Sequence, residues 1–389
     1  MSGPLRVVVI GAGPAGLALA QGLHRAGTDV VVYERDAALD ARSQGYRILL
    51  NNAGWASLRA CLPEPVLALA EATSGELHGP TTRYDHRLET LGTWATAASD
   101  DLHPVDRAVL RHVLMHGIAE RVTFGRRFSR VEEDGDRVRV VFDDGSADVG
   151  DVVVGADGAF SGVRGQLHPE IGFVRSELVA AMGRTPVDDR FALLASGSGA
   201  RIEAPGLNLT VAPMLFRTPP SYASPELPAT ESYLRWLLML PPDHPVAEAA
   251  RRKADQTVTG TDARDTVLGL IEGWHPLVRD LIEHSSAHNG WMVTPKLLDR
   301  PLPPWDTERV TLLGDAAHLT LPSGGNGLAT ALRDAATLLE HLTGTDDTVA
   351  GLRAYQREML VYGQAAVEVG VDRQRHVVPE RVTDSPRPS

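Results

Sequence analysis

The sequence has few thiols and few lysines. Among 389 residues there is one cysteine, Cys61, and there are two lysines, Lys253 and Lys296. A single cysteine excludes an internal disulfide and a structural zinc site built on cysteines, and it is typical of a reducing compartment. Neither lysine completes a G-x-x-x-x-G-K-[ST] pattern, which excludes a P-loop, and two lysines leave little scope for Schiff-base chemistry.

Positive charge and long apolar runs are also scarce. The chain carries 38 Lys+Arg against 50 Asp+Glu, a net charge of −12, so a nucleic-acid partner, which needs clustered positive charge, is not expected. The apolar stretch 7–23 is interrupted by Pro14, follows a single basic residue, Arg6, and lacks a small-residue cleavage site, so it predicts neither a signal peptide nor a stable membrane insertion. We expect a cytoplasmic protein.

The rest of the composition is that of a folded protein. Hydrophobic residues make up 43% of the chain, which argues against wholesale disorder, and the length allows two or three domains. His112 and His116 stand at a spacing that can bind zinc on a helix, but no third ligand is evident, and we expect no metal site.

The first 34 residues predict a strand, a helix and a second strand. A β-branched run over 5–10 is followed by a G-x-G-x-x-G motif, a helical pattern that ends at Gly27, and a second β-branched run over 29–33. The residues of this turn are Gly11, Gly13, Pro14, Ala15 and Gly16. Such glycines allow the tight turn, the approach of a pyrophosphate and the close packing of helix on strand, while the helix N-terminus offers N–H groups to the phosphates.

An acidic residue completes the pattern. Glu34 lies eighteen positions after Gly16, at the end of the second strand. Its carboxylate can accept hydrogen bonds from ribose hydroxyls and repels a 2′-phosphate, which favours an unphosphorylated adenosine ribose. The sequence therefore predicts a dinucleotide site; the alternative is a tight turn without a ligand.

Two later segments narrow the choice of dinucleotide. The segment 157–164 reads Asp-Gly-Ala-Phe-Ser-Gly-Val-Arg, and the segment 313–318 reads Leu-Gly-Asp-Ala-Ala-His and precedes the glycine-rich stretch 322–327. These segments resemble the D-G-x-x-S-x-V-R and G-D-A-A-H signatures of the single-component (class A) flavoprotein monooxygenases. That family includes para-hydroxybenzoate hydroxylase, polyketide aromatic hydroxylases and tetracycline-inactivating monooxygenases. The three motifs occur in the family's order and spacing over nearly the whole chain.

The resemblance implies an α/β fold. It consists of a Rossmann-like FAD-binding domain, an inserted, mainly antiparallel β-sheet substrate domain and a long C-terminal helix. We place the FAD-binding domain in 1–72, 97–170 and 296–340, the substrate domain in 73–96 and 171–295, the bracing helix in 341–376 and a disordered tail in 377–389. Local patterns add a helix over 104–121 and a mainly β layer with a helix or two over 170–300.

The resemblance also assigns roles to single residues. Asp315 would accept from the ribityl chain of FAD, and the loop with Gly325, Gly327 and Leu328 would lie against the flavin ring; here the loop reads Gly-Asn-Gly where the family often has Gly-Gln-Gly. The remaining cofactor candidates are Arg107 and Arg35 on FAD, Asp157 on FAD and the nicotinamide cofactor, and Arg42, with Arg47 as a second choice, on NADPH. For each the alternative is an ordinary solvated charge, or a polar turn residue in the case of Asp157.

The implied activity is an NAD(P)H-dependent FAD monooxygenase. It would insert one oxygen atom of O₂, through a flavin hydroperoxide, into an aromatic or polyketide-like molecule by hydroxylation or epoxidation, in secondary metabolism or antibiotic modification. No catalytic residue is named, because the cofactor supplies the chemistry, and the sequence does not distinguish NADPH from NADH or fix the oligomeric state. Alternatives are an FAD-dependent reductase or oxidase of the same fold and a flavin carrier without enzymatic activity. Five apolar side chains either line a substrate pocket or pack the core, and core packing is the preferred interpretation: Met214, Phe216, Trp236, Met239 and Trp291.

Overall fold

The computed structural model describes most of the chain. The described residues are 5–41, 46–94, 102–175, 179–252, 258–259, 261–286, 291–293, 296–306, 308–321 and 325–377. Arg42 and the proposed tail from 378 onward lie outside these residues.

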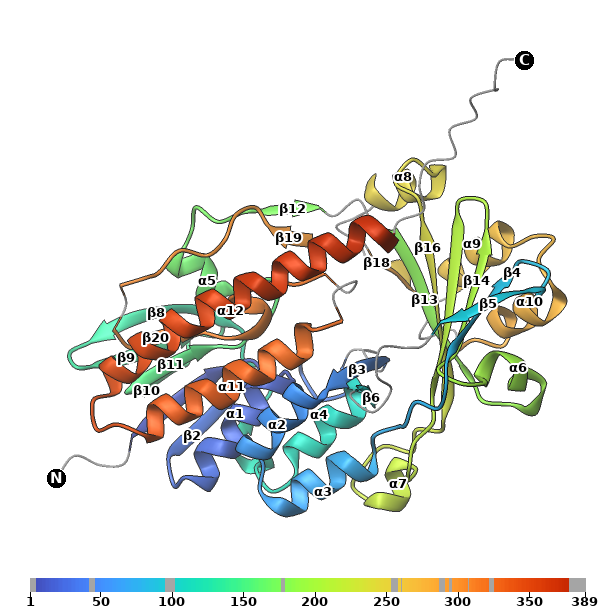
Figure 1. Cartoon of the computed structure of the whole chain (residues 1–389). Coiled ribbons are helices and arrows are strands. Elements are labelled where there is room, and N and C mark those ends of the chain that lie inside the picture. Colours follow the sequence, from blue (N-terminus) through green and yellow to red (C-terminus); the bar gives the residue numbers. More distant parts are fainter. Residues whose placement is uncertain are drawn as a thin grey trace.

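A parallel sheet lies at the centre of one part of the molecule, and we call this sheet with the helices packed on it the first layer (Figure 1). Its order is β20-β11-β1-β2-β7, and all its pairings are parallel. The strands are β1 (Arg6–Ile10), β2 (Asp29–Tyr33), β7 (Val122–Thr123), β11 (Val152–Gly155) and β20 (Val310–Leu312). The valines of β1 are wholly buried, as expected for a strand covered on both faces.

Helices cover this sheet. Helix α1 (Pro14–Arg25) connects β1 to β2, and α11 (Gly327–Thr343) packs against α1, α2 and the long α12 (Thr348–Val377). Figure 1 shows α12 running along the domain toward the larger sheet. The remaining helices of this part are α2 (Asn52–Cys61), α3 (Glu64–Ala72), α4 (Arg107–Met115), η2 (Ala119–Arg121), α5 (Gly162–Leu167) and η4 (Gly314–Ala316).

Three small sheets are attached to this layer. A meander pairs β10, β9 and β8 in that order, a two-stranded ribbon pairs β3 with β6, and β12 pairs with β19. Their bounds are β3 (Arg47–Asn51), β6 (Leu102–Asp106), β8 (Phe128–Asp134), β9 (Arg137–Phe142), β10 (Ala147–Gly150), β12 (Phe173–Arg175) and β19 (Lys296–Leu298). In Figure 1 the β3–β6 ribbon lies between the helices of the first layer and the larger sheet.

Among the described residues, the larger sheet has eight strands in the order β17-β18-β13-β16-β15-β14-β4-β5, and only the β14–β4 pairing is parallel. The strands are β4 (Thr81–Asp85), β5 (Thr90–Trp94), β13 (Val179–Pro186), β14 (Ala200–Ala204), β15 (Leu207–Met214), β16 (Tyr233–Leu240), β17 (Val258–Thr259) and β18 (Trp291–Val293).

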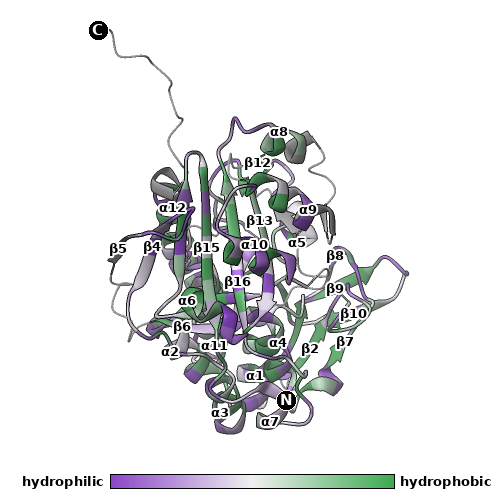
Figure 2. Ribbon diagram, turned by 90° about the vertical axis from the view of Figure 1, so that its right-hand side faces the viewer, coloured by the Kyte–Doolittle hydropathy of each residue, from purple (hydrophilic) through white to green (hydrophobic). Residues whose placement is uncertain are grey.

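Helices cover the face of this sheet that points away from the first layer (Figure 1). Alternate residues of β16, among them Leu234 and Trp236, share a buried cluster with residues of α9 and α10. Figure 2, seen from that side, shows the largely hydrophobic strands β13 and β15. Helix α10, which carries hydrophilic residues, packs against β13. The helices of this part are η3 (Asp189–Phe191), α6 (Ala192–Ala195), α7 (Pro220–Ala223), α8 (Pro245–Arg252), α9 (Thr261–Leu270) and α10 (Pro276–Glu283).

The predicted fold class is confirmed, whereas two local predictions are wrong. Residues 104–106 belong to strand β6, because they pair with β3, and the helix starts only at Arg107, where Asp106 caps it by accepting from the backbone N–H groups of Ala108 and Val109. The segment 170–300 holds five described α-helices rather than one or two. The domain limits stay a prediction. No helix in the described ranges is long and apolar enough to cross a lipid bilayer.

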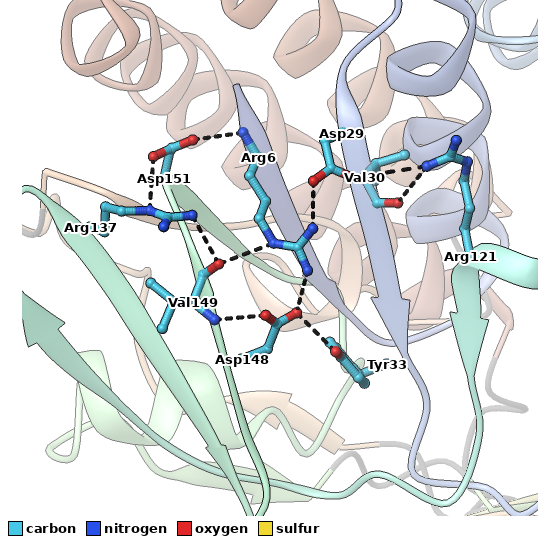
Figure 3. A network of polar contacts seen from close by, with 9 residues as sticks. All are labelled: Arg6, Asp29, Val30, Tyr33, Arg121, Arg137, Asp148, Val149 and Asp151. Atoms are coloured by element: carbon cyan, nitrogen blue, oxygen red, sulfur yellow. Dashed lines mark hydrogen bonds and ion pairs between the residues drawn. The ribbon is translucent and has the colours of Figure 1, made fainter. Parts of the chain in front are cut away.

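A polar network surrounds the N-terminal end of β1, the central strand of the parallel sheet (Figure 3). Arg6 donates to Asp29 on β2 and to Asp148 on β10, with N···O distances of 2.5 and 2.8 Å. Asp148 also accepts from the hydroxyl of Tyr33 at 2.9 Å. The meander is thereby joined to the parallel sheet by side chains as well as by the chain itself.

Candidate functional site

The turn between β1 and α1 contains glycines that serve different purposes. Gly11 has a φ of +114°, and a Cβ there would lie 2.3 Å from the carbonyl oxygen of Ala156; a Cβ on Gly16 would lie 2.3 Å from the oxygen of Gly11. The protein itself therefore requires these two glycines. A Cβ on Gly13 would meet no atom within 4 Å. Because Gly13 has no side chain, a ligand can approach the backbone closely at this position, which fits the binding of a pyrophosphate.

The N-terminus of α1 faces the same space. Gly13 is the N-cap, so no side chain accepts from the first N–H groups, and the first turn contains no acidic residue. Pro14 opens the helix without needing a hydrogen-bond acceptor, and Ala15 and Gly16 are buried. The remaining free N–H groups and the positive end of the helix dipole fit a phosphate group.

Glu34 lies at the end of β2 and is only 6% exposed. One carboxylate oxygen accepts from the N–H of Ala12 and the other from the N–H of Asp36, both at 2.9 Å. Glu34 thus holds the glycine turn in place, and since each carboxylate oxygen has two lone pairs, capacity for a ribose hydroxyl remains. Its role on the ribose stays a prediction, as does that of the half-buried Arg35 beside it.

Arg111 belongs to this turn although the sequence reasoning did not name it. Its Nε donates to the carbonyl oxygen of Ala12 at 2.7 Å, and its guanidinium lies 3.4 Å from Glu34 Oε2. It stands one helical turn after Arg107, on the helix that the resemblance associated with FAD. That spacing was the available signal.

Asp157 is bound within its own turn. One oxygen accepts from the hydroxyl of Ser161 and the other from the N–H of Gly162, at 2.7 Å in the latter case. Burial raises the pKa of Asp157, and these hydrogen bonds oppose the rise. The carboxylate therefore organises the start of α5, and its predicted contact with FAD and the nicotinamide cofactor stays a prediction.

Arg164 connects two motifs that are far apart in the sequence. It is 3% exposed, and its guanidinium donates to the carbonyl oxygens of Ala159 at 2.6 Å and Ala316 at 2.8 Å. It thereby joins the turn after β11 to the turn after β20. Burial lowers its pKa, which Asp157 and Asp315 partly offset.

Asp315 lies in η4, directly after strand β20. Its side chain is exposed, yet the surrounding protein desolvates the carboxylate and raises its pKa, while the charges of His318, Arg107 and Arg164 oppose the rise. The structure thus brings Arg107 and Asp315 within electrostatic reach of each other. The exposed carboxylate of Asp315 could accept hydrogen bonds from the hydroxyls of a ribityl chain.

The loop before α11 presents a second uncapped helix N-terminus. Gly325 has a φ of +63°. Gly327 begins the helix, and a Cβ there would lie 2.4 Å from the hydroxyl oxygen of Thr320, so the position favours glycine. Leu328 follows, half-buried against the main core. Asn326 is the N-cap, but its side chain accepts from no N–H of the helix, and within the described residues its Oδ1 has no partner. The N–H groups of the first turn of α11, which no side chain caps, fit the electron-rich edge of a flavin.

Asp334 on α11 is a second residue that the sequence reasoning missed. It is fully buried and accepts from His318, from the N–H of Gly314 and from the hydroxyl of Tyr362. His318 therefore has a supporting role in its motif. The position of Asp334 among the apolar residues of α11 was the available signal.

Other residues that the sequence singled out pack in the core or form ion pairs. Met214 and Trp236 are fully buried in two different cores, and Phe216 and Met239 are nearly so, as the core-packing interpretation predicted. The side chain of Trp291 lies outside the described residues. His112 and His116 pair with Asp40 and Glu226 respectively. No cluster of three metal-ligating side chains occurs in the described ranges.

Comparison with known proteins agrees with this geometry. A family model described as "FAD binding domain" matches residues 4–188 and 249–369. The phenazine 1,6-dicarboxylic acid hydroxylase PhzS of Lysobacter antibioticus is 31% identical over 94% of this chain and 89% of that protein. A crystal structure from Photorhabdus luminescens, assigned as an FAD-containing monooxygenase, superposes with a TM-score of 0.80 and 26% identity, covering 97% of this chain and all of that one.

Another relative is longer than this chain. The dual O-methyltransferase/FAD-dependent monooxygenase elcB of Phaeosphaeria nodorum is 33% identical over 86% of this chain but only 40% of that protein. The chain therefore spans less than half the length of that relative. Since the family model nonetheless matches well over half of the chain, and the turns after β1, β11 and β20 lie against one another, the chain belongs to the FAD-binding, class A flavin monooxygenase family.

Proposed function

We propose that the protein is an NAD(P)H-dependent FAD monooxygenase that inserts one oxygen atom from O₂ into an aromatic or polyketide-like small molecule. The observation that carries the proposal is the contact among the motif turns, where Arg164 after β11 donates to the carbonyl oxygens of Ala159 and Ala316. Two relatives are named for aromatic substrates, phenazine 1,6-dicarboxylic acid and 6-hydroxynicotinate. A further relative is the FAD-dependent monooxygenase thnD of Trichoderma harzianum.

Different residues of the three motif turns would hold different parts of FAD. The N-terminus of α1 and Gly13 would receive the pyrophosphate, Asp315 the ribityl hydroxyls, and the loop at Gly325 and Gly327 the flavin edge. Bound there, FAD would supply hydride acceptance from NAD(P)H and activation of O₂. The protein would supply fixed donors and exclude water. The nicotinamide specificity and the role of Arg42 belong to this proposal.

The proposal is tested on purified protein loaded with FAD. Stopped-flow measurement of flavin reduction by NADPH and NADH, across a panel of aromatic acids, phenols and polyketides, is expected to show acceleration by at least one compound. Labelled O₂ then reports whether one oxygen atom enters the product.

Two outcomes would contradict the proposal. If the purified protein takes up no FAD, the proposed cofactor site does not exist. Substrate turnover without O₂ consumption would favour the reductase alternative.

A further inference from the structure

The long helix α12 lies against the turn that follows β20. Gly363 contacts His318, and a Cβ there would lie 2.6 Å from Cδ2 of the imidazole. Gly370 contacts Leu321, where a Cβ would lie 3.3 Å from the backbone nitrogen. The two glycines are seven positions apart and therefore share one face of the helix. Because they have no side chains, this face approaches the segment 318–321 closely.

The same face of α12 also reaches the loop before α11. Asn326 Nδ2 donates to the carbonyl oxygen of Ala366 at 3.3 Å. Ala366 lies three positions after Gly363 and four before Gly370, so this contact belongs to the same stripe of the helix. Helix α12 is thus packed behind the segments 314–321 and 325–327, which contain Asp315 and the glycines predicted to hold the flavin ring.

A hydrogen-bond cluster at Asp334 connects α12 to the turn. Asp334 Oδ1 accepts from the hydroxyl of Tyr362 at 2.8 Å, whereas Oδ2 accepts from the N–H of Gly314 and from His318 Nε2, both at 2.6 Å. Tyr362 belongs to α12, while Gly314 and His318 belong to the turn after β20. One carboxylate is therefore shared between the helix and the turn.

Burial makes these partners depend on one another. Asp334 is fully buried and His318 is 5% exposed. Burial opposes the positive charge of His318, but Asp334 and Asp315 prevail and raise the pKa of the imidazole above its usual value. A buried carboxylate that loses one of its donors is left partly uncompensated, which costs more than the hydrogen bond itself contributes. Release of Tyr362 is therefore expected to disturb the contacts of Asp334 with the turn as well.

Gly314 transmits this effect to Asp315. It directly precedes Asp315, and its φ of +62° turns the chain between β20 and that residue. On the other side, Arg164 donates to the carbonyl oxygens of Asp315 and Ala316 at 3.2 and 2.8 Å. The backbone of Asp315 is thus held from two sides, and Asp334 supplies one of them.

We propose that Asp334 is a positioning residue of the FAD site, which couples the binding of FAD at Asp315 to the docking of α12 through Tyr362. Linkage is reciprocal: if docking of α12 tightens FAD binding, bound FAD must stabilise the docked helix by the same factor. Figure 1 shows α12 extending toward the larger sheet, so occupancy of the cofactor site would act where the first layer meets that sheet. The inference rests on the part of the proposed function that places FAD beside Asp315, and it is independent of the reaction.

Tyr355 provides a matched comparison on the same helix. It lies about two turns before Tyr362 and is fully buried, and its hydroxyl donates to the carbonyl oxygen of Leu312 on β20, also at 2.8 Å. Each tyrosine attaches α12 to the region of β20 by one hydrogen bond, but Tyr362 does so through Asp334 and Tyr355 does not. Tyr355→Phe therefore removes a bond of the same kind and length without touching the proposed link.

The test measures FAD affinity and hydrogen exchange in the wild type, Tyr362→Phe, Asp334→Asn and Tyr355→Phe. Dissociation constants come from fluorescence titration of the FAD-free proteins, and exchange over 356–370 is followed with and without FAD. We expect FAD to slow exchange in α12 of the wild type and of Y355F. In Y362F and D334N this protection should disappear and FAD should bind about fivefold or more weakly. The visible spectrum of the bound flavin should also shift in both, because the turn of Asp315 moves.

Thermal melting separates the link from ordinary loss of stability, because Y355F and Y362F should be destabilised alike while only Y362F loses affinity. Equal FAD affinity in Y355F and Y362F, or unchanged exchange in α12 when the wild type binds FAD, would overturn the inference. The exchange measurement on the wild type decides the question if a variant does not fold. A wild type that binds no FAD would contradict the proposed function itself, whereas FAD binding without protection of α12 would contradict the inference alone.

Discussion

His318 Nε2 lies 2.6 Å from Asp334 Oδ2, and both side chains are buried. The same carboxylate accepts from the backbone N–H of Gly314 at 2.6 Å and from the hydroxyl of Tyr362 at 2.8 Å. One acid on α11 thus holds the turn after β20 and fastens α12 to it. The position of Asp315, which follows Gly314, depends on this pair.

Asp334→Asn is expected to lower the free energy of unfolding by about 3 kcal/mol, because it breaks a buried charged pair. Burial opposes the charge of His318, but Asp334 prevails and raises the pKa of the histidine above its usual 6.5. The stabilisation is therefore fully present below about pH 6.5 and is lost as pH rises through the higher folded-state pKa. Chemical denaturation from pH 5 to 9 is expected to show this decline in the wild type and a flatter profile in D334N. Equal slopes in both proteins would contradict the assignment.

Arg164→Lys is expected to weaken FAD binding by about tenfold or more while the net charge is unchanged. A lysine has no fork with which to reach the carbonyl oxygens of both Ala159 and Ala316. Isothermal titration with FAD measures the affinity, and hydrogen exchange over 157–164 and 314–318 is expected to accelerate. Arg353→Lys, at an exposed ion pair with Glu308, is the control and should leave both measurements unchanged. An R164K protein with wild-type affinity would show that the connection is dispensable.

The first layer could be predicted from the sequence because its signals are local. The run 29–33 is a strand with the predicted limits, and the run 5–10 contains strand β1 (Arg6–Ile10). Each consists of β-branched residues bounded by a turn, so neighbours in the sequence contain the information. The motif at Gly11 is of the same kind, since strand, turn and helix follow one another.

The contacts that complete the site could not be predicted in this way. Asp334 acts on His318 across two elements, and Tyr233 donates to Asp106 only because β16 pairs within a sheet assembled from distant segments. The strand at 104–106 was also missed, because its partner β3 lies far back in the sequence. Tertiary pairing overrides local helical preference there.

Asp148→Asn is expected to destabilise the protein by about 1–2 kcal/mol without affecting FAD binding. The network of Figure 3 lies at the start of β1, whereas the glycine turn follows the end of that strand. Burial, helped by the hydrogen bond to Asp148, raises the pKa of Tyr33 to about 12. Stability supplied by neutral Tyr33 is present below the unfolded value of 10.0 and is lost as pH rises toward 12, so D148N should lose less stability over that interval. Ultraviolet tyrosinate titration checks the pKa, and an unchanged high-pH titration in D148N would refute its cause.

Gly13→Ala and Gly16→Ala differ by one methyl group at the same turn and should fail in different ways. At Gly13 the added Cβ meets no protein atom within 4 Å, so we expect the FAD-free protein to lose only about 0.5 kcal/mol, the cost of a poorer N-cap. FAD affinity should nevertheless fall by about tenfold or more, since the methyl group occupies the space of the pyrophosphate. At Gly16 the Cβ would lie 2.3 Å from the oxygen of Gly11, so the FAD-free protein should itself be strongly destabilised.

Thermal melting of the FAD-free proteins and fluorescence titration with FAD separate the two effects. A G13A protein that is destabilised as much as G16A would mean that the glycine serves the fold alone, and a G13A protein that binds FAD normally would remove the pyrophosphate from this turn. Because no protein atom stands near the missing Cβ of Gly13, loss of affinity with retained stability has one physical cause, which is contact between that methyl group and the ligand.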